Sequence, residues 1–260
     1  MTGLGNRIKS LPTEREGSAA AVIRAVRAEH LKMKRTFGRV LPAVSALLAL
    51  LSVLSFSRGK YFAVSAWNWW YAMLLPGMLS ILCYLGMKRE KKLHYAGLLT
   101  LPWRPSVCLS GKILYYAGHL FLANLLLMAG TFVAAAFWGS DIAPSNSLAA
   151  VILLSVCYLW EIPLFMIMGA RFGIFVSLFS CMTLTIGGTA VLAASKLWWV
   201  CPSAVPIRLM GPVLGILPNG LMAPQDSPVL DPGVLLPGIW ICLIWFAGLA
   251  GLAMRCFKEA

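Results

Sequence analysis

Long runs without charged residues dominate this sequence. A helix needs about 20 apolar residues to cross the hydrocarbon core of a bilayer. Six runs approach or exceed that length, and only Glu161 interrupts one of them. The runs are continuously apolar rather than alternating, so they predict helices and not the strands of a membrane barrel. We expect an all-α polytopic membrane protein whose six transmembrane helices cover residues 40–57, 68–87, 113–137, 148–170, 172–194 and 234–254.

The charge content leads to the same class of protein. Of the 260 residues, 60 % are hydrophobic and only 12 % are charged, whereas a soluble domain is about 25 % charged. The net charge of +13 is compatible with a nucleic acid or with an anionic membrane surface. The basic residues flank the apolar runs and form no separate soluble domain. Their position therefore favours a lipid bilayer and argues against a nucleic-acid partner.

Lys and Arg residues predict the orientation, because the cytoplasmic segments of membrane proteins carry an excess of them. With the N-terminus inside, segments 1–39, 88–112 and 255–260 and the turn at Arg171 carry 18 of the 22. The outer segments carry the other four, which are Arg58, Lys60, Lys196 and Arg208. We therefore expect both termini in the cytoplasm.

The N-terminal region divides into two parts. Residues 1–17 contain Gly, Pro and mixed charges and are predicted to be a disordered tail. Residues 18–37 place an apolar stripe opposite a basic face, which is typical of an amphipathic helix lying in the membrane interface. A plain basic anchor for the first span is the alternative.

Two loops are more than simple connections. The cytoplasmic loop 88–112 begins with a basic cluster and continues with an apolar patch, so it either lies on the membrane or docks a cytoplasmic partner. The outer loop 195–233 contains seven prolines, and its part 209–225 is free of charge. We expect that part to be re-entrant or interfacial. A seventh span is the alternative, and it would put the C-terminus outside.

Sequence motifs for nucleotide, metal or nucleophile chemistry are absent. Gly111-Lys112 is followed by Ile113 and is not part of a phosphate-binding GxxxxGK[ST] loop. There is no HExxH or GxSxG, and no two of the seven cysteines have CxxC spacing. We expect no catalytic residue, no metal and no cofactor in this chain, and therefore no enzyme.

Glu161 is the one acid inside a predicted span. Ionisable groups in a bilayer are costly and are candidates for function. Glu161 has three readings: a structural role that includes pairing with Arg171, a place on a substrate or coupling path, or a proton relay. Asn68 and Asn124 are the other polar candidates, and amides between membrane helices more often hold helices together than bind ligands.

Several local stretches resemble a known family of exporters. They are AEHLKMKRTF at 28–37, WNWWYAMLLPG at 67–77, EKKLHYAGLLTLP at 90–102, GKI at 111–113 and LWWVCPSAVPIRLMGPVLGILPNGL at 197–221. Together with a basic lead-in and six spans, they resemble the permease subunits of lantibiotic-immunity ABC transporters. These are the E or G subunits of LanFEG systems of the epidermin and mutacin type, with an ABC-2 type membrane fold. The resemblance covers roughly residues 25–258.

The resemblance implies a division of labour. Residues 38–256 would form the permease domain, and a second, homologous permease subunit would complete the pore as a heterodimer or a homodimer. A separate cytoplasmic ATPase would bind ATP and Mg. It would contact the coupling loop at about 90–110, where the candidate residues are Lys91, Lys92, Leu93, Tyr95, Leu98, Leu99 and Leu101.

The implied substrate is a lantibiotic peptide inserted in the cytoplasmic membrane of a Gram-positive bacterium. An exporter that takes an amphiphilic peptide from lipid needs apolar and aromatic surface near the outer leaflet, although an ordinary interfacial belt explains the same rings. The candidate residues for the substrate path are Trp67, Asn68, Trp69, Trp70, Tyr71, Glu161, Trp198, Trp199, Pro218 and Asn219.

Three other functions compete with this one. The same fold could export another peptide, a drug or a lipid. An intramembrane enzyme would need a paired nucleophile and base, and Glu161 stands alone among the acids. A non-transporting sensor or structural subunit would not bind an ATPase.

Overall fold

A computed structural model describes residues 18–93 and 105–258. Within these ranges the chain is mainly helical, and its only β pairing is an isolated bridge between Ile216 and Met222. The predicted all-α class is therefore confirmed. The expected tail 1–17 lies outside the described residues.

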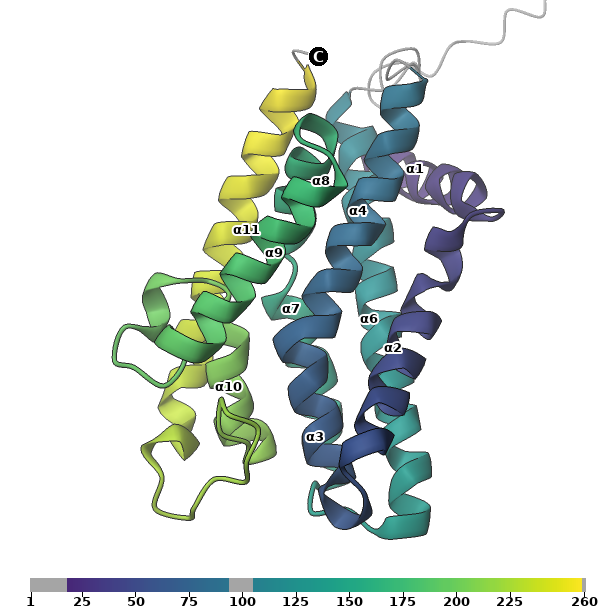
Figure 1. The fold of residues 1–260 in the computed structure, drawn as a ribbon. Coiled ribbons are helices and arrows are strands. Elements are labelled where there is room, and N and C mark those ends of the chain that lie inside the picture. Colours follow the sequence, from purple (N-terminus) through teal and green to yellow (C-terminus); the bar gives the residue numbers. More distant parts are fainter. Residues whose placement is uncertain (1–17, 94–104, 259–260) are drawn as a thin grey trace, which may run out of the picture.

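Four helical stretches are long and apolar enough to cross a membrane. The first, α2 (Phe37–Phe56), matches the predicted span 40–57. The second joins η1 (Gly59–Tyr61), α3 (Phe62–Trp69), the π-helical turn η2 (Trp70–Leu74) and α4 (Leu75–Lys92) in one helical path. The others are α6 (Pro105–Trp138) and α11 (Leu235–Lys258). Figure 1 shows these helices running along the bundle.

The fourth predicted span, 148–170, is broken. The helices α7 (Pro144–Cys157) and α8 (Glu161–Arg171) meet at an angle of 46° and count as a fifth candidate only together. Pro163 supplies the physical reason, because a proline has no N–H to donate and its ring clashes with the carbonyl four residues earlier. The first helix, α7, therefore ends at Cys157, and α8 begins at Glu161.

The predicted span 172–194 is divided as well. It contains the short helix α9 (Ile174–Ile186) and the π-helical segment η3 (Gly187–Leu192). Alone, α9 has 13 residues and is too short to cross a bilayer.

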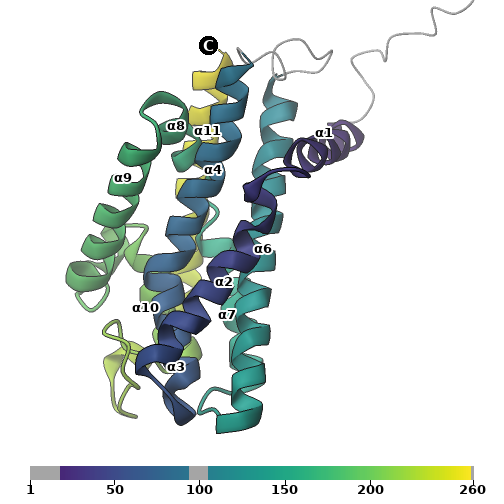
Figure 2. The same cartoon turned by 45° about the vertical axis from the view of Figure 1, so that its right-hand side comes forward.

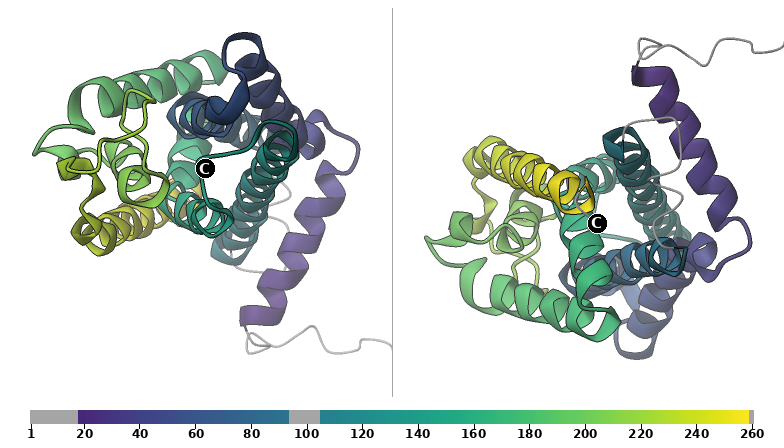
Figure 3. Two further views of the ribbon diagram at one scale, coloured as in Figure 1. Left: turned by 90° about the horizontal axis from the view of Figure 1, so that it is seen from below. Right: turned by 90° about the horizontal axis from the view of Figure 1, so that it is seen from above.

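The predicted amphipathic helix is α1 (Ser18–Met33). It lies across the bundle at the end where α4 and α11 terminate (Figures 1 and 2). Seen along the bundle, it lies on the outside, next to α6 (Figure 3). Ile23 and Leu31 are exposed on it, as expected for a helix whose apolar side meets lipid.

The outer loop 195–233 is partly helical. After η4 (Trp198–Val200), α10 (Ala204–Leu214) packs against α7, η3 and α11. The loop then continues through η5 (Pro228–Leu230) and η6 (Pro232–Val234) to α11. Gly215 ends α10 with a φ of 71°, a left-handed conformation that glycine adopts without strain. With 11 residues, α10 is too short for a seventh span.

The core lies where α4 meets α8 and α6. Gly86 of α4 lies against the hydroxyl end of Tyr116 on α6, and a Cβ at Gly86 would clash with the Tyr116 hydroxyl. That hydroxyl is buried and has no hydrogen-bond partner among the described residues. The two helices therefore need a glycine at this crossing, as is common where membrane helices approach closely.

Replacing Gly86 with alanine is expected to destabilise the protein by about 1–3 kcal/mol, because the added methyl overpacks the crossing. The double variant Gly86→Ala/Tyr116→Phe should recover most of this loss, since it removes the clashing hydroxyl. Unfolding in detergent measures both. Equal stability of wild type and Gly86→Ala would contradict the close packing.

Candidate functional site

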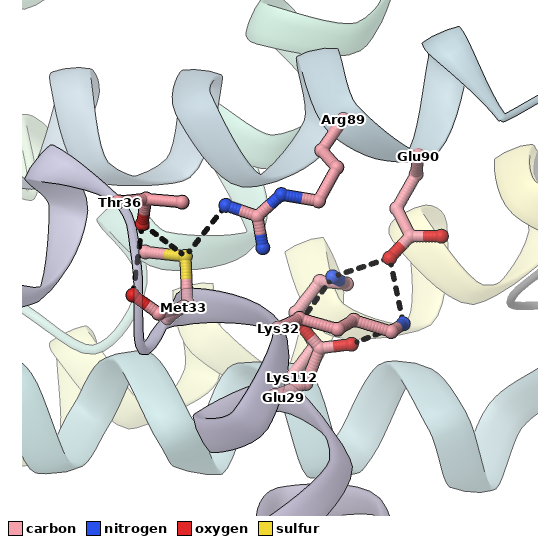
Figure 4. A network of polar contacts seen from close by, with 7 residues as sticks. All are labelled: Glu29, Lys32, Met33, Thr36, Arg89, Glu90 and Lys112. Atoms are coloured by element: carbon pink, nitrogen blue, oxygen red, sulfur yellow. Dashed lines mark hydrogen bonds and ion pairs between the residues drawn. The ribbon is translucent and has the colours of Figure 1, made fainter.

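Four charged side chains from three helices form a buried ionic cluster at the α1 end of the bundle (Figure 4). Lys112 Nζ on α6 lies 2.7 Å from Glu29 Oε2 on α1 and 3.1 Å from Glu90 Oε1 on α4. Lys32 Nζ on α1 lies 2.8 Å from Glu29 Oε1 and 2.9 Å from Glu90 Oε1. Two lysines and two glutamates thus bridge α1, α4 and α6.

Burial makes this cluster energetically demanding. The Lys112 and Glu90 side chains are each 1 % exposed, so each charge depends on its partners. Burial lowers the pKa of Lys32, but its hydrogen bonds to Glu29 and Glu90 and their charges raise it above its usual value overall. Lys32 is therefore charged at neutral pH.

Close backbone packing brings the cluster together. Gly111 of α6 lies against Ala25 of α1 so tightly that a Cβ at Gly111 would clash with it. Arg89 Nη2 also lies 3.2 Å from Met33 Sδ at the end of α1 (Figure 4). Two residues on, α4 ends with the exposed Lys91 and Lys92.

The candidate docking residues fall into two groups. Lys91, Lys92 and Leu93 are exposed at the end of α4. The helix thus extends into the predicted loop 88–112, and α6 already begins at Pro105, because Lys, Arg and Glu are good helix formers. The other four residues lie outside the described residues: Tyr95, Leu98, Leu99 and Leu101.

A second polar feature lies inside the bundle, and we call it the interior polar chain: Asn68, Trp70, Tyr71, Asn124, Ser155 and Tyr158. Trp70 Nε1 donates to Asn124 Oδ1 at 2.8 Å, and Asn124 Nδ2 donates to Ser155 Oγ at 3.0 Å. These bonds connect η2, α6 and α7.

The other half of the chain connects the two irregular helical breaks. The Tyr158 hydroxyl, at the α7–α8 break, donates to the Tyr71 carbonyl in the π-helical turn η2. The Tyr71 hydroxyl donates to Asn68 Oδ1 at 2.9 Å. π-Helical turns occur frequently at functional sites. The two breaks in the bundle are thus joined through side chains.

The structure brings two of the resembling stretches into contact. The Asn68 side chain touches the backbone of Gly220, where a Cβ would clash with it. Gly220 has a φ of 85°, which favours glycine for a second reason. The neighbouring Asn219 is exposed and accepts a hydrogen bond from the Leu221 N–H, and Pro218 is half-buried.

The tryptophans divide between core and surface. Trp67 and Trp70 are fully buried, as is Tyr71, whereas Trp69 is 41 % exposed. These buried rings, near the end of α3 and in η2, pack between helices instead of forming an interfacial belt. In the outer loop Trp199 is 55 % exposed and Trp198 is half-buried.

Glu161 is buried at the first position of α8, and its Oε2 has no partner among the described residues. It does not pair with Arg171, which ends the same helix in an exposed position about 15 Å away by helical rise. The nearby groups come from other helices and include Cys83, Cys181 and Cys242. Within the described ranges no group of three His, Cys, Asp or Glu residues could hold a metal ion.

Sequence reasoning missed the ionic cluster, Ser155 and Tyr158. Glu29 and Glu90 carried a usable signal, since each is an acid within a strongly basic segment. The chain matches no protein-family model, no curated protein and no solved structure.

Proposed function

We propose that the chain is a membrane permease subunit of an ABC exporter that removes lantibiotic peptides from the cytoplasmic membrane of a Gram-positive bacterium. A separate cytoplasmic ATPase powers the exporter, and a second, homologous permease completes it. This chain is itself no enzyme. The proposal rests on the resemblance of residues 25–258 and on the placement of the two polar sites.

The observation that supports the proposal most is the helical path from Gly59 to Lys92. The first half of this path carries Asn68, Trp70 and Tyr71 of the interior polar chain. Its C-terminal end carries Lys91 and Lys92, which are exposed and adjacent to the ionic cluster. A continuous helical path that joins a docking site to a polar interior is what a permease needs to transmit force from an ATPase.

We assign the substrate path to the interior polar chain and the outer loop. Buried polar groups between membrane helices mark substrate paths, and Trp67 Nε1 and Glu161 Oε2 are buried without partners among the described residues. Asn68 links this interior to the turn at Gly220. An amphiphilic peptide would meet Trp69 and Trp199 first, because both rings are exposed.

We propose in addition that the chain crosses the membrane six times and has both termini in the cytoplasm. The pair α7–α8 is one passage, and α9 with η3 is another. The α1 end of the bundle is then cytoplasmic, which agrees with its excess of Lys and Arg.

Fusions to the C-terminus test this topology. Green fluorescent protein fused there is expected to fluoresce, and alkaline phosphatase at the same site is expected to be inactive, because both would lie in the cytoplasm. Active phosphatase with a dark fluorescent fusion would place the C-terminus outside and would require an odd number of passages.

Protection of a lantibiotic-sensitive host tests the function. The chain is expressed with and without its sister permease and its ATPase, and the inhibitory concentrations of a panel of lantibiotics are measured. We expect protection against at least one peptide only when all subunits are present. An assembled complex that hydrolyses ATP and protects against no lantibiotic would move the cargo to another peptide, a drug or a lipid.

A further inference from the structure

A groove of about 400 Å³ lies between α1, α2 and α6, on the outside of the bundle. Its polar wall contains His30 from α1, Arg39 from α2, and Tyr115 and His119 from α6, where His119 Nδ1 lies 3.1 Å from the Tyr115 carbonyl. Its apolar wall contains Leu114 and Leu122. We call it the α1–α6 groove.

The polar wall has unused hydrogen-bond donors. The Tyr115 side chain is only 6 % exposed. Its hydroxyl is buried and has no hydrogen-bond partner among the described residues. The Arg39 side chain lines the same groove, is exposed, and makes no ion pair or hydrogen bond with any described residue. The His30 ring stands edge-on to the Tyr115 ring, at 6.2 Å between centroids. The Arg39 guanidinium and the Tyr115 hydroxyl are therefore donors without an acceptor among the described residues.

The charge of the groove is positive. Its wall contains no carboxylate. The closest acid along α1, Glu29, is turned to the ionic cluster, where Lys32 and Lys112 neutralise it at 2.8 and 2.7 Å. An anion in the groove would thus meet Arg39 without competition from a buried acid.

The apolar wall points to a lipid rather than to a free anion. Leu114, Gly118 and Leu122 are spaced by four residues and form one strip along α6. Leu114 and Leu122 are 52 % and 44 % exposed, and Gly118 faces open space. The strip leads from the donor groups, at the level of the interfacial helix α1, along the surface of a helix that is long and apolar enough to cross the membrane.

We infer that the α1–α6 groove binds one anionic phospholipid. Its phosphate accepts hydrogen bonds from Arg39, His30 and the Tyr115 hydroxyl, and its acyl chains lie along the strip of Leu114, Gly118 and Leu122. Basic pockets between membrane helices at the headgroup level are known to bind anionic headgroups. This site goes beyond the proposed export function and does not depend on it.

Short-chain lipids test the inference on the purified full-length chain in neutral detergent. Dioctanoyl phosphatidylglycerol, dioctanoyl phosphatidylcholine and inorganic phosphate are titrated separately, and binding is followed by native mass spectrometry. We expect the anionic lipid to bind at least about tenfold more tightly than the other two, as expected for a charge-assisted hydrogen-bond site. Equal binding of phosphatidylcholine would overturn the charge preference, and equal binding of inorganic phosphate would overturn the lipid as occupant.

Variants locate the site. Arg39→Gln should weaken phosphatidylglycerol binding about tenfold by removing a charged donor. Gly118→Trp should weaken it at least as much by filling the open strip. Tyr115→Phe, which removes only a hydroxyl, is a milder variant that should fold normally and bind less. Arg35→Gln also removes an exposed charge, but outside the groove, and should bind like wild type. Unchanged binding by folded Arg39→Gln and Tyr115→Phe would refute the assignment.

Discussion

Replacing Lys112 with methionine is expected to destabilise the protein by about 3–5 kcal/mol, the usual cost of breaking a buried ion pair from one side. Methionine preserves most of the volume and removes only the charge. Glu29 and Glu90 would then share the single charge of Lys32, leaving one buried negative charge uncompensated. Unfolding by a denaturing detergent, followed by tryptophan fluorescence, measures the loss.

A matched control and a rescue variant make this prediction specific. Lys34→Met removes an exposed charge in the turn after α1 and should change the stability by less than about 0.5 kcal/mol. The double variant Lys112→Met/Glu90→Gln restores a neutral cluster and should recover much of the loss. If Lys112→Met is no less stable than Lys34→Met, the cluster does not hold α1 to the bundle.

Reversing the charges of Lys91 and Lys92 to glutamate is expected to abolish protection against lantibiotics. Both side chains are exposed at the end of α4, within the proposed ATPase contact. Like charges set against each other at an interface cost several kcal/mol, which corresponds to at least about a 100-fold loss of ATPase affinity. The inhibitory concentration and the amount of co-purified ATPase should fall together.

Lys34→Glu/Arg35→Glu is the matched control for this reversal. It makes the same change in charge at the same end of the bundle, but in the turn between α1 and α2. We expect it to keep the ATPase and the protection. An equal loss of ATPase and protection in both double variants would indicate a general effect of charge at this end of the bundle. No loss in either variant would show that the end of α4 does not dock the ATPase.

Apolar runs predicted the long helices because burial in lipid demands a continuous apolar helix. Residues 40–57 were expected and α2 covers Phe37–Phe56. The same reasoning missed the break before Glu161, because hydropathy does not register the missing N–H of Pro163. At Trp67 and Trp70 the structure adds that both rings are buried between helices. Composition alone cannot distinguish an interfacial ring from a packed one.

The polar sites were harder to predict because their partners are distant in sequence. Lys112 and Glu29 are 83 residues apart, and Trp70 and Asn124 are 54 residues apart. Each pair depends on which helices are neighbours, and apolar runs carry no such information. Local signals were nevertheless present, because a single acid within a basic segment, such as Glu29, indicates an ion pair.

We propose above all that this chain is the membrane part of an ATP-driven peptide exporter. The most direct test is ATP hydrolysis by the complex of this chain, its sister permease and the ATPase, reconstituted in lipid. We predict that a lantibiotic stimulates hydrolysis severalfold and that Lys91→Glu/Lys92→Glu removes the stimulation. If no ATPase associates with the chain at all, the exporter account is contradicted.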